Sequence, residues 1–289
     1  MFRFVFFLLL CANTLAANPA VDVNTAGEVY LAAGIREQVS ASLGAMPAKI
    51  RQIYAADTRA TLSAKQLAAA YAAAKRGFRI DVFEPPALAA FAANLDQRAV
   101  KKSLDFLASD TGQRMVAADI AVSKLDEATI NKITSGMLST PLSPERDALF
   151  AKLEQAAHSA ESAVQIYLTI GRALAVGTEL GAGLDLQAAE QHVKSRDAAT
   201  PAGDMESGLN MPLRRYMAYG YRDLSDADLR KLLSFLDSNA GKTYVKAYIA
   251  AMSAGFQAMG RRCGGQIGES WRELAQAQAP PAPQPETGP

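Results

Sequence analysis

Apolar residues recur at intervals of three and four along most of the chain, which is the period of an amphipathic helix. Two stretches show this clearly, each with aliphatic residues on one helical face: Val100, Leu104 and Leu107 in the first, and Leu229, Leu232, Leu233 and Leu236 in the second. Alternating β-branched runs, which are typical of strands, are almost absent. Alanine, leucine, glutamine, lysine and glutamate dominate, and these residues favour helices. The pattern predicts an all-α fold, a helical bundle.

The starts of several helices can be recognised from their capping residues. Five serine or aspartate residues stand directly before a helical pattern, as N-caps do: Ser63, Asp126, Ser143, Asp185 and Ser225. Ser63 and Gln66 have the spacing of a capping box, in which each side chain bonds the other residue's backbone amide. Ser225 and Asp228 have the same spacing.

One phrase occurs twice in the chain. "LDFLASDTGQRMV" begins at Leu104 and "LSFLDSNAGKTYV" at Leu233, so that Gly112 and Gly241 lie 129 positions apart (241 − 112). Further towards the N-terminus, "YLAAG" from Tyr30 is echoed by "YLTIG" from Tyr167. These echoes predict an internal duplication, with one helical half at 27–140 and a second at 143–278.

The repeated phrase predicts a tight helix–corner–helix unit in each half. Ser109 and Ser238 end one helix and cap the next, whose third residue is Gly112 or Gly241. Glycine inside a helix costs about 1 kcal/mol relative to alanine, which indicates a compensating reason. We expect that the missing Cβ lets the second helix approach the helix that carries Phe106 or Phe235.

The segment "LSDADLRKLLSFLDSNAGKTYVKAYIAAM", and more loosely "LDQRAVKKSLDFLASDTGQRMV", resembles the bacterial family called domain of unknown function 2059. The family often has proline after the serine, where Asp110 and Asn239 stand in this chain. The resemblance covers two short segments. It implies an exported, all-α bacterial protein and transfers no catalytic residues.

The first residues predict a secretory signal peptide. A single Arg3 precedes an apolar run from Phe4 to Ala12, and small residues then suit cleavage after Ala16 or Ala17. The run is short for a membrane anchor, the rival interpretation. We therefore expect residues 1–16 to be removed and the mature protein to be periplasmic, with no transmembrane segment. The proline-rich tail at 279–289 is predicted to be disordered.

Charge and composition exclude some kinds of partner. Loss of Arg3 leaves 29 basic residues (30 − 1) against 29 acidic ones, so that the mature chain is close to neutral. Nucleic-acid binding depends on a concentrated basic surface, and neutrality argues against it. Half of the residues are apolar, which predicts a folded protein with a substantial core.

Candidate chemistry is sparse. His158 is flanked by Glu154 and Glu161 at helical spacing, so that the three are candidates for a metal site on one helix face. A matching cluster on another helix is missing, and a solvated charged face is the favoured interpretation. "GTELGAG" from Gly177 lacks the lysine of a phosphate loop and indicates helix termination. We expect no metal, no cofactor and no catalytic residues.

Three further features have both a structural and a functional interpretation. Cys263 lies beside two arginines that favour a reactive thiolate, but an inert solitary thiol is preferred because no resolving cysteine is present. Trp271, in a segment expected to be a short helix, either docks that helix or anchors a partner. The same choice applies to Arg214, Arg215 and Tyr216, where packing of an amphipathic helix is preferred to a partner site.

The sequence therefore predicts where this protein acts better than what it does. The first hypothesis is an exported, non-enzymatic protein-interaction or structural module of the cell envelope, with an unknown envelope protein as partner. The alternative is a carrier that holds an apolar small molecule or lipid in a cavity between its helices.

Overall fold

The computed structural model describes residues 21–56, 61–196 and 202–278, and within these residues the chain forms fourteen α-helices and no strand. The predicted all-α class is confirmed. The predicted signal peptide at 1–16 and the proline-rich tail at 279–289 lie outside the described residues. None of the helices in the described part of the chain combines the length and the hydropathy needed to cross a bilayer.

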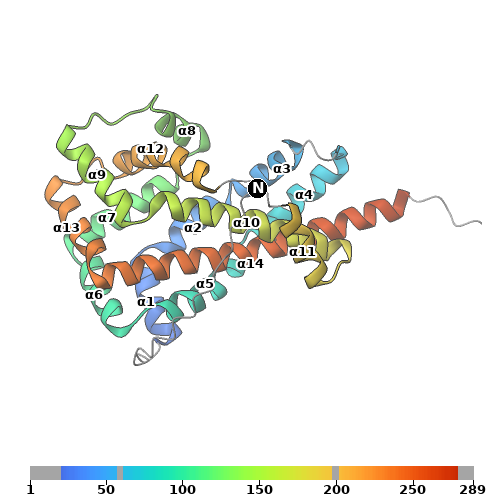
Figure 1. Cartoon of the computed structure of the whole chain (residues 1–289), viewed down its shortest axis with the longest axis horizontal. Helices are drawn as coiled ribbons and strands as arrows, with labels where there is room; N and C mark the ends of the chain where they lie inside the picture. Colours follow the sequence, from blue (N-terminus) through green and yellow to red (C-terminus); the bar gives the residue numbers. More distant parts are fainter. Residues whose placement is uncertain (1–20, 57–60, 197–201, 279–289) are drawn as a thin grey trace, which may run out of the picture.

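The helices follow one another with short connections, as Figure 1 shows. Their bounds are α1 (Val23–Ala32), α2 (Ile35–Leu43), α3 (Met46–Ala56), α4 (Ala64–Gly77), α5 (Ile80–Asn94), α6 (Gln97–Leu107), α7 (Asp110–Ser123), α8 (Glu127–Ser135), α9 (Pro144–Ala156), α10 (Ser159–Ala182), α11 (Leu186–Arg196), α12 (Ala202–Gly220), α13 (Asp226–Asp237) and α14 (Asn239–Gln278).

The predicted caps are confirmed at the starts of these helices. In each case the side chain accepts a hydrogen bond from the backbone amide three residues further on: Ser63, Asp126, Ser143, Asp185 and Ser225. Ser63 with Gln66 and Ser225 with Asp228 both form complete capping boxes. Because each cap satisfies an amide that the helix leaves unbonded, local sequence is sufficient to define where these helices begin.

Helix α14 is the long axis of the molecule. Its 40 residues extend over about 60 Å at 1.5 Å per residue, and Figure 1 shows α10 beside it. It packs on α10 most extensively and also on α4, α5 and α6. The expectation that the segment after Cys263 forms a separate short helix is wrong, because α14 continues through it without a break.

A glycine seam joins α10 and α14, and it explains why the glycines of α14 do not end the helix. The seam consists of five glycines: Gly177 and Gly181 on α10, and Gly260, Gly264 and Gly268 on α14. A Cβ added to Gly264 would lie 2.8 Å from the Thr178 amide nitrogen, and one on Gly268 would lie 2.7 Å from that of Ala182. The two backbones therefore touch, which only glycine permits.

The seam also corrects the interpretation of the "GTELGAG" stretch. Only Gly183, with a φ of 111°, ends α10, as the sequence predicts. Gly177 and Gly181 lie inside the helix, in contact with α14. Because residue numbers rise together along the contact, the two helices run parallel to each other.

The two predicted halves, 27–140 and 143–278, share one hydrophobic core. The main cluster includes fully buried Phe83 and Phe91 from the first half and Leu229 and Met259 from the second. Helix α14 belongs to the second half by sequence but packs against three helices of the first. The halves are thus parts of one body.

The repeated corner is built in the same way at both places. The Ser109 hydroxyl accepts a hydrogen bond from the Gly112 amide at 3.1 Å, and Ser238 accepts one from Gly241 at 3.0 Å. A Cβ on Gly112 would lie 2.8 Å from the Leu107 Cα and would collide with the carbonyl oxygen of Phe106.

The second corner has the same steric limit. A Cβ on Gly241 would lie 2.8 Å from the Leu236 Cα and would collide with the carbonyl oxygen of Phe235. The predicted reason for both glycines, a close approach between successive helices, is confirmed. The corners also meet, because the rings of Phe106 and Phe235 stack with parallel planes and centroids 4.3 Å apart.

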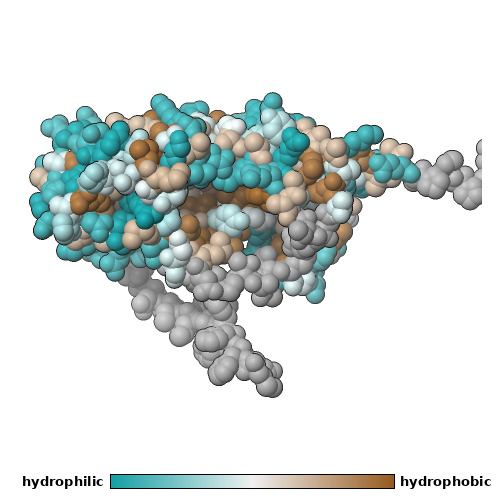
Figure 2. Space-filling model, turned by 90° about the horizontal axis from the view of Figure 1, so that it is seen from above, coloured by the Kyte–Doolittle hydropathy of each residue, from teal (hydrophilic) through white to brown (hydrophobic). Residues whose placement is uncertain are grey.

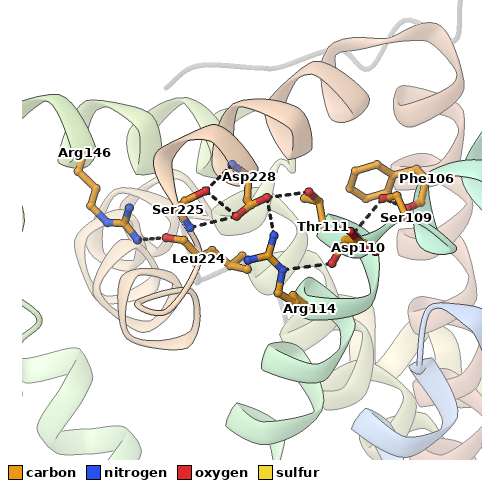
Figure 3. Close-up of polar contacts among 10 residues, drawn as sticks. Phe106, Ser109, Asp110, Thr111, Arg114, Arg146, Leu224, Ser225 and Asp228 are labelled. Atoms are coloured by element: carbon orange, nitrogen blue, oxygen red, sulfur yellow. Dashed lines mark hydrogen bonds and ion pairs between the residues drawn. The ribbon is translucent and has the colours of Figure 1, made fainter.

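A buried carboxylate further connects the two corners (Figure 3). Asp228 on α13 accepts hydrogen bonds from the Thr111 hydroxyl and the Arg114 guanidinium of α7, each at 2.8 Å. The hydroxyl of Ser225 donates a third at 2.6 Å. Hydrogen bonds from Ser225 and then Thr111 lower the pKa of Asp228 to about 2, so that the carboxylate stays ionised near neutral pH.

The second pair of similar segments, which begin at Tyr30 and Tyr167, does not have the same structure at its two places. Tyr30 is 1% exposed and is followed by Gly34, whose φ of 63° separates α1 from α2. Tyr167 is 59% exposed, and Gly171 lies in the interior of α10 with nothing near its Cβ position. The two corners share a construction, but the predicted internal duplication is not confirmed.

Candidate functional site

An open groove lies between α10 and α14 on the N-terminal side of the glycine seam, and we name it the α10–α14 groove. It consists of two hollows with volumes of about 830 and 400 Å³, which share Glu161 and Gln165. Helix α11 borders the larger hollow through Glu190 and Lys194. The smaller hollow lies where α10 and α14 begin.

The groove is a direct consequence of helical spacing. On α10, Gln165, Leu168 and Arg172 stand three or four residues apart and face the groove. On α14, Ser253 and Gln257 do the same at a spacing of four. The lining ends at Val176 and Arg261, next to Gly177 and Gly260, where the glycines of the seam bring the two backbones together.

The lining of the groove is basic, although the chain as a whole is close to neutral. It contains five cationic side chains against two carboxylates, Glu161 and Glu190: Arg172, Lys194, Lys242, Lys246 and Arg261. Both carboxylates have partners within the groove. Glu190 pairs with Arg261 at 2.9 Å, and Glu161 lies 3.2 Å from the His158 ring. The surplus of charge in the groove is therefore positive.

The candidate metal cluster at His158 is not assembled. The predicted shared helix face is wrong, because His158 separates α9 from α10 in a left-handed conformation with a φ of 49°. Glu154 belongs to α9 and lies 3.7 Å from the Arg214 guanidinium, while only Glu161 approaches the histidine. Among residues 21–56, 61–196 and 202–278, no group of three or more His, Cys, Asp and Glu side chains could hold a metal ion.

The three candidate interaction residues of α12 bind other helices of the same chain. Tyr216 donates a hydrogen bond to the Val122 carbonyl at 3.1 Å, and Arg215 donates one to the Thr134 carbonyl at 3.0 Å. Arg214 approaches the carboxylates of α9. These contacts favour the packing interpretation, in which α12 is attached to α7, α8 and α9.

Trp271 packs the far end of α14 against the α3–α4 pair. Its indole Nε1 donates a hydrogen bond to the Gln66 carbonyl at 3.1 Å, and its ring meets Tyr54 edge to face at 5.3 Å between centroids. The side chain is half-buried. The interpretation in which this tryptophan fixes the helix to the body accounts for both contacts.

Cys263 is the free cysteine of the described residues, and it is buried. It faces α4, where a Cβ added to Gly77 would lie 2.7 Å from the Cys263 Cα. Burial raises the pKa of the thiol to about 12, which opposes formation of the nucleophilic thiolate. The geometry thus fits the inert thiol and not the reactive one.

Sequence reasoning missed a polar cluster around Asp119. The Tyr221 hydroxyl hydrogen-bonds the Asp119 carboxyl group, and Tyr216, Tyr244 and Tyr248 lie close enough for its charge to affect their ionisation. Burial raises the pKa of Asp119 from 3.8 to about 7. The one available signal was a single acidic residue within the apolar stretch "MVAADIAV".

Comparison with known proteins does not assign the site. No protein-family model matches the sequence, and no match was found among curated proteins or among solved structures.

Proposed function

We propose that this chain is an exported, non-enzymatic protein-interaction module of the bacterial cell envelope, and that the α10–α14 groove holds a segment of its partner. Export is inferred from residues 1–16 and from the resemblance to the domain of unknown function 2059 family. The interaction role is inferred from the groove.

The observation that carries the proposal is the shape and lining of the groove. From His158 to Val176 it follows α10 for about 27 Å, at 1.5 Å per residue. An extended segment of about eight residues has the same length. Gln165 and Gln257 are exposed on opposite walls, where their amides can bond the backbone of such a segment.

The chemistry of the lining favours a polypeptide over an apolar ligand. Sites for apolar molecules are predominantly hydrophobic, with few polar groups. The groove instead combines charged and amide side chains with short aliphatic ones such as Val164 and Leu168. Non-obligate protein interfaces are only about as apolar as the rest of a protein surface, so this mixed lining fits a polypeptide.

The apolar-carrier alternative is supported by a hydrophobic area of the surface. Seen from above, hydrophobic residues gather in a hollow near the middle of the elongated body, between bands of hydrophilic ones (Figure 2). Organic extraction of the purified native protein, followed by mass spectrometry, tests this alternative. A stoichiometric co-purifying lipid favours the carrier, and its absence favours the interaction module.

The interaction role can be tested with a photo-crosslinking amino acid. Benzoyl-phenylalanine replaces Gln257 in the groove, or Gln97 as an equally exposed control on α6, in the full chain expressed with its leader. We expect discrete crosslinked partners from the Gln257 position alone. Equal crosslinking from both positions, or none from Gln257, contradicts the proposal.

Export is tested separately by fractionation and N-terminal sequencing of the mature protein. We expect the periplasmic fraction to contain a chain that begins at Ala17 or Asn18. A cytoplasmic chain that still begins at Met1 contradicts the export part of the proposal while leaving the groove argument intact.

A further inference from the structure

We propose that the partner segment is acidic, and that its carboxylates bind Lys242 and Lys246 at the end of the groove where α10 and α14 begin. This inference rests on the proposed function, in which the groove holds a polypeptide. It adds the chemistry of the partner and the position at which the partner is recognised.

The two lysines are placed where they do not help the fold. Lys242 and Lys246 are exposed, line the smaller hollow, and form no ion pair within the described part of the chain. Like charges four residues apart on a helix are destabilising by about 0.2–0.5 kcal/mol. Lys242 also lies in the first turn of α14, where the helix dipole disfavours a cation and no acidic residue compensates. An external carboxylate would relieve both effects.

The ends of two helices add to the positive potential at this place. Because α10 and α14 run parallel, both N-termini lie at this end of the groove, and each carries about half a positive charge. His158 makes no side-chain capping bond to α10. The first amides of α10 therefore have no side-chain acceptor from their N-cap.

A buried hydroxyl is a separate indication that this end of the groove is incomplete. Ser162 lines the smaller hollow and is only 9% exposed, and its Oγ has no hydrogen-bond partner among the described residues. Buried hydroxyls are normally bonded, and one that is not calls for an explanation. Rotation of the Ser162 side chain towards the hollow would let a carboxylate or backbone group of the partner segment supply the missing hydrogen bond.

The rest of the groove also favours an acidic polypeptide. Lys194 brings further positive charge to the larger hollow, beyond the Arg261–Glu190 pair. The lining contains no Phe, Tyr or Trp ring on which a nucleobase could stack. Glu161 and Glu190 would also repel a continuous row of phosphates. The groove therefore suits an acidic polypeptide better than a nucleic acid.

The test is a charge reversal with a matched control. Lys242→Glu/Lys246→Glu changes the groove, and Lys101→Glu/Lys102→Glu makes the same change in net charge on exposed positions of α6. The probes are a fluorescein-labelled glutamate-rich peptide, a lysine-rich peptide of equal length, oligo-dT, and phosphatidylglycerol vesicles. Binding to the full mature chain is measured by fluorescence anisotropy for the peptides and oligo-dT, and by co-sedimentation for the vesicles, at low and at physiological salt.

We expect the acidic peptide to bind in preference to the other probes, and we expect its affinity to fall as the salt concentration increases. The groove reversal should weaken this binding roughly tenfold or more, and the α6 reversal by less than about threefold. The groove variant should still fold, because an acidic residue in the first turn of α14 is favourable. Circular dichroism and thermal unfolding check that point.

Several results would overturn the inference. These are equal binding of the acidic and basic peptides, stronger binding of oligo-dT or vesicles, and equal losses in the two reversal variants. The proposed function fails separately. If the groove reversal leaves partner crosslinking at Gln257 unchanged, the groove still binds a protein, but that protein is not recognised through its acidic residues.

Discussion

The corner between α6 and α7 and the corner between α13 and α14 share their construction but differ in what surrounds them. Both have a serine cap, a glycine in backbone contact, and a phenylalanine that stacks on its counterpart. Their polar partners differ. Asp228 of the second corner stands where the first has Ala99, and Asp119 stands where the second has Tyr248, each pair 129 positions apart.

This difference shows that the residues of a corner are constrained in two ways, by backbone geometry and by contacts with the other corner. The glycine is required by backbone geometry, which is the same in any pair of helices that turns in this way. The charged residues instead tie one corner to the other, and a connection between two units needs its carboxylate on only one side. Substitutions can therefore test whether the corners are equivalent in their packing and unequal in their electrostatics.

The largest effect is expected from Asp119→Asn. The pKa of Asp119 is about 7 in the folded protein against 3.8 in the unfolded chain, so the folded state retains a proton that the unfolded state releases. Its contribution to stability is fully present below about pH 3.8 and is lost as the pH rises to about 7. The loss amounts to on the order of 4 kcal/mol.

We therefore expect the asparagine variant to be more stable than the native protein at about pH 8, with little difference at about pH 4. Urea denaturation at a series of pH values measures this. Tyr248→Phe is the control at the matched position of the second corner, and it should not alter the pH dependence. Parallel stability curves for the native and asparagine proteins would show that Asp119 does not titrate in this range.

The next largest effects on stability are expected from substitutions of the corner glycines. Gly112→Ala and Gly241→Ala should each destabilise the fold by roughly 2–3 kcal/mol, because the new Cβ meets a carbonyl oxygen and a Cα of the preceding helix. Gly171→Ala is the control, since its Cβ position on α10 is open, and it should stabilise by about 0.5–1 kcal/mol. Denaturation midpoints measure all three variants. Losses that differ by more than about 1 kcal/mol between the corners would mean that they are not equivalent.

Local sequence was sufficient to predict the features that depend on neighbouring residues. The caps at Ser63 and Ser225 and the corner glycines all follow from contacts within six residues of each other. The class of fold follows from the same helical spacing. These features could be predicted because their physical causes lie within a single turn or corner.

Features that depend on distant residues could not be predicted. Gly264 looks like a helix breaker until Thr178 of α10 is placed against it, 86 positions away (264 − 178). The α10–α14 groove needs both helices and their parallel direction. The raised pKa of Asp119 depends on burial and on Tyr221, which follows α12 and which the sequence does not place beside it.

The serine caps should have smaller effects than the glycines. Ser109→Ala and Ser238→Ala each leave the amide of the corner glycine without its acceptor, which typically costs about 1 kcal/mol. Ser238 is exposed and Ser109 is half-buried, so water can replace the lost bond more readily at the second corner. We expect the first corner to lose more stability in chemical denaturation. The opposite order would contradict this argument from exposure.

The smallest expected effect is the coupling between Phe106 and Phe235. Their stacked rings are one direct contact between the two corners, and aromatic pairs contribute about 0.5–1.5 kcal/mol beyond the area that they bury. A double-mutant cycle with Phe106→Leu and Phe235→Leu isolates this term from the loss of each ring alone. Phe235 also lies 5.9 Å from the Tyr244 ring, centroid to centroid, so Phe235→Leu alone should cost more than Phe106→Leu. A coupling indistinguishable from zero would mean that the rings only fill space between the corners, and that Asp228 carries the specific connection.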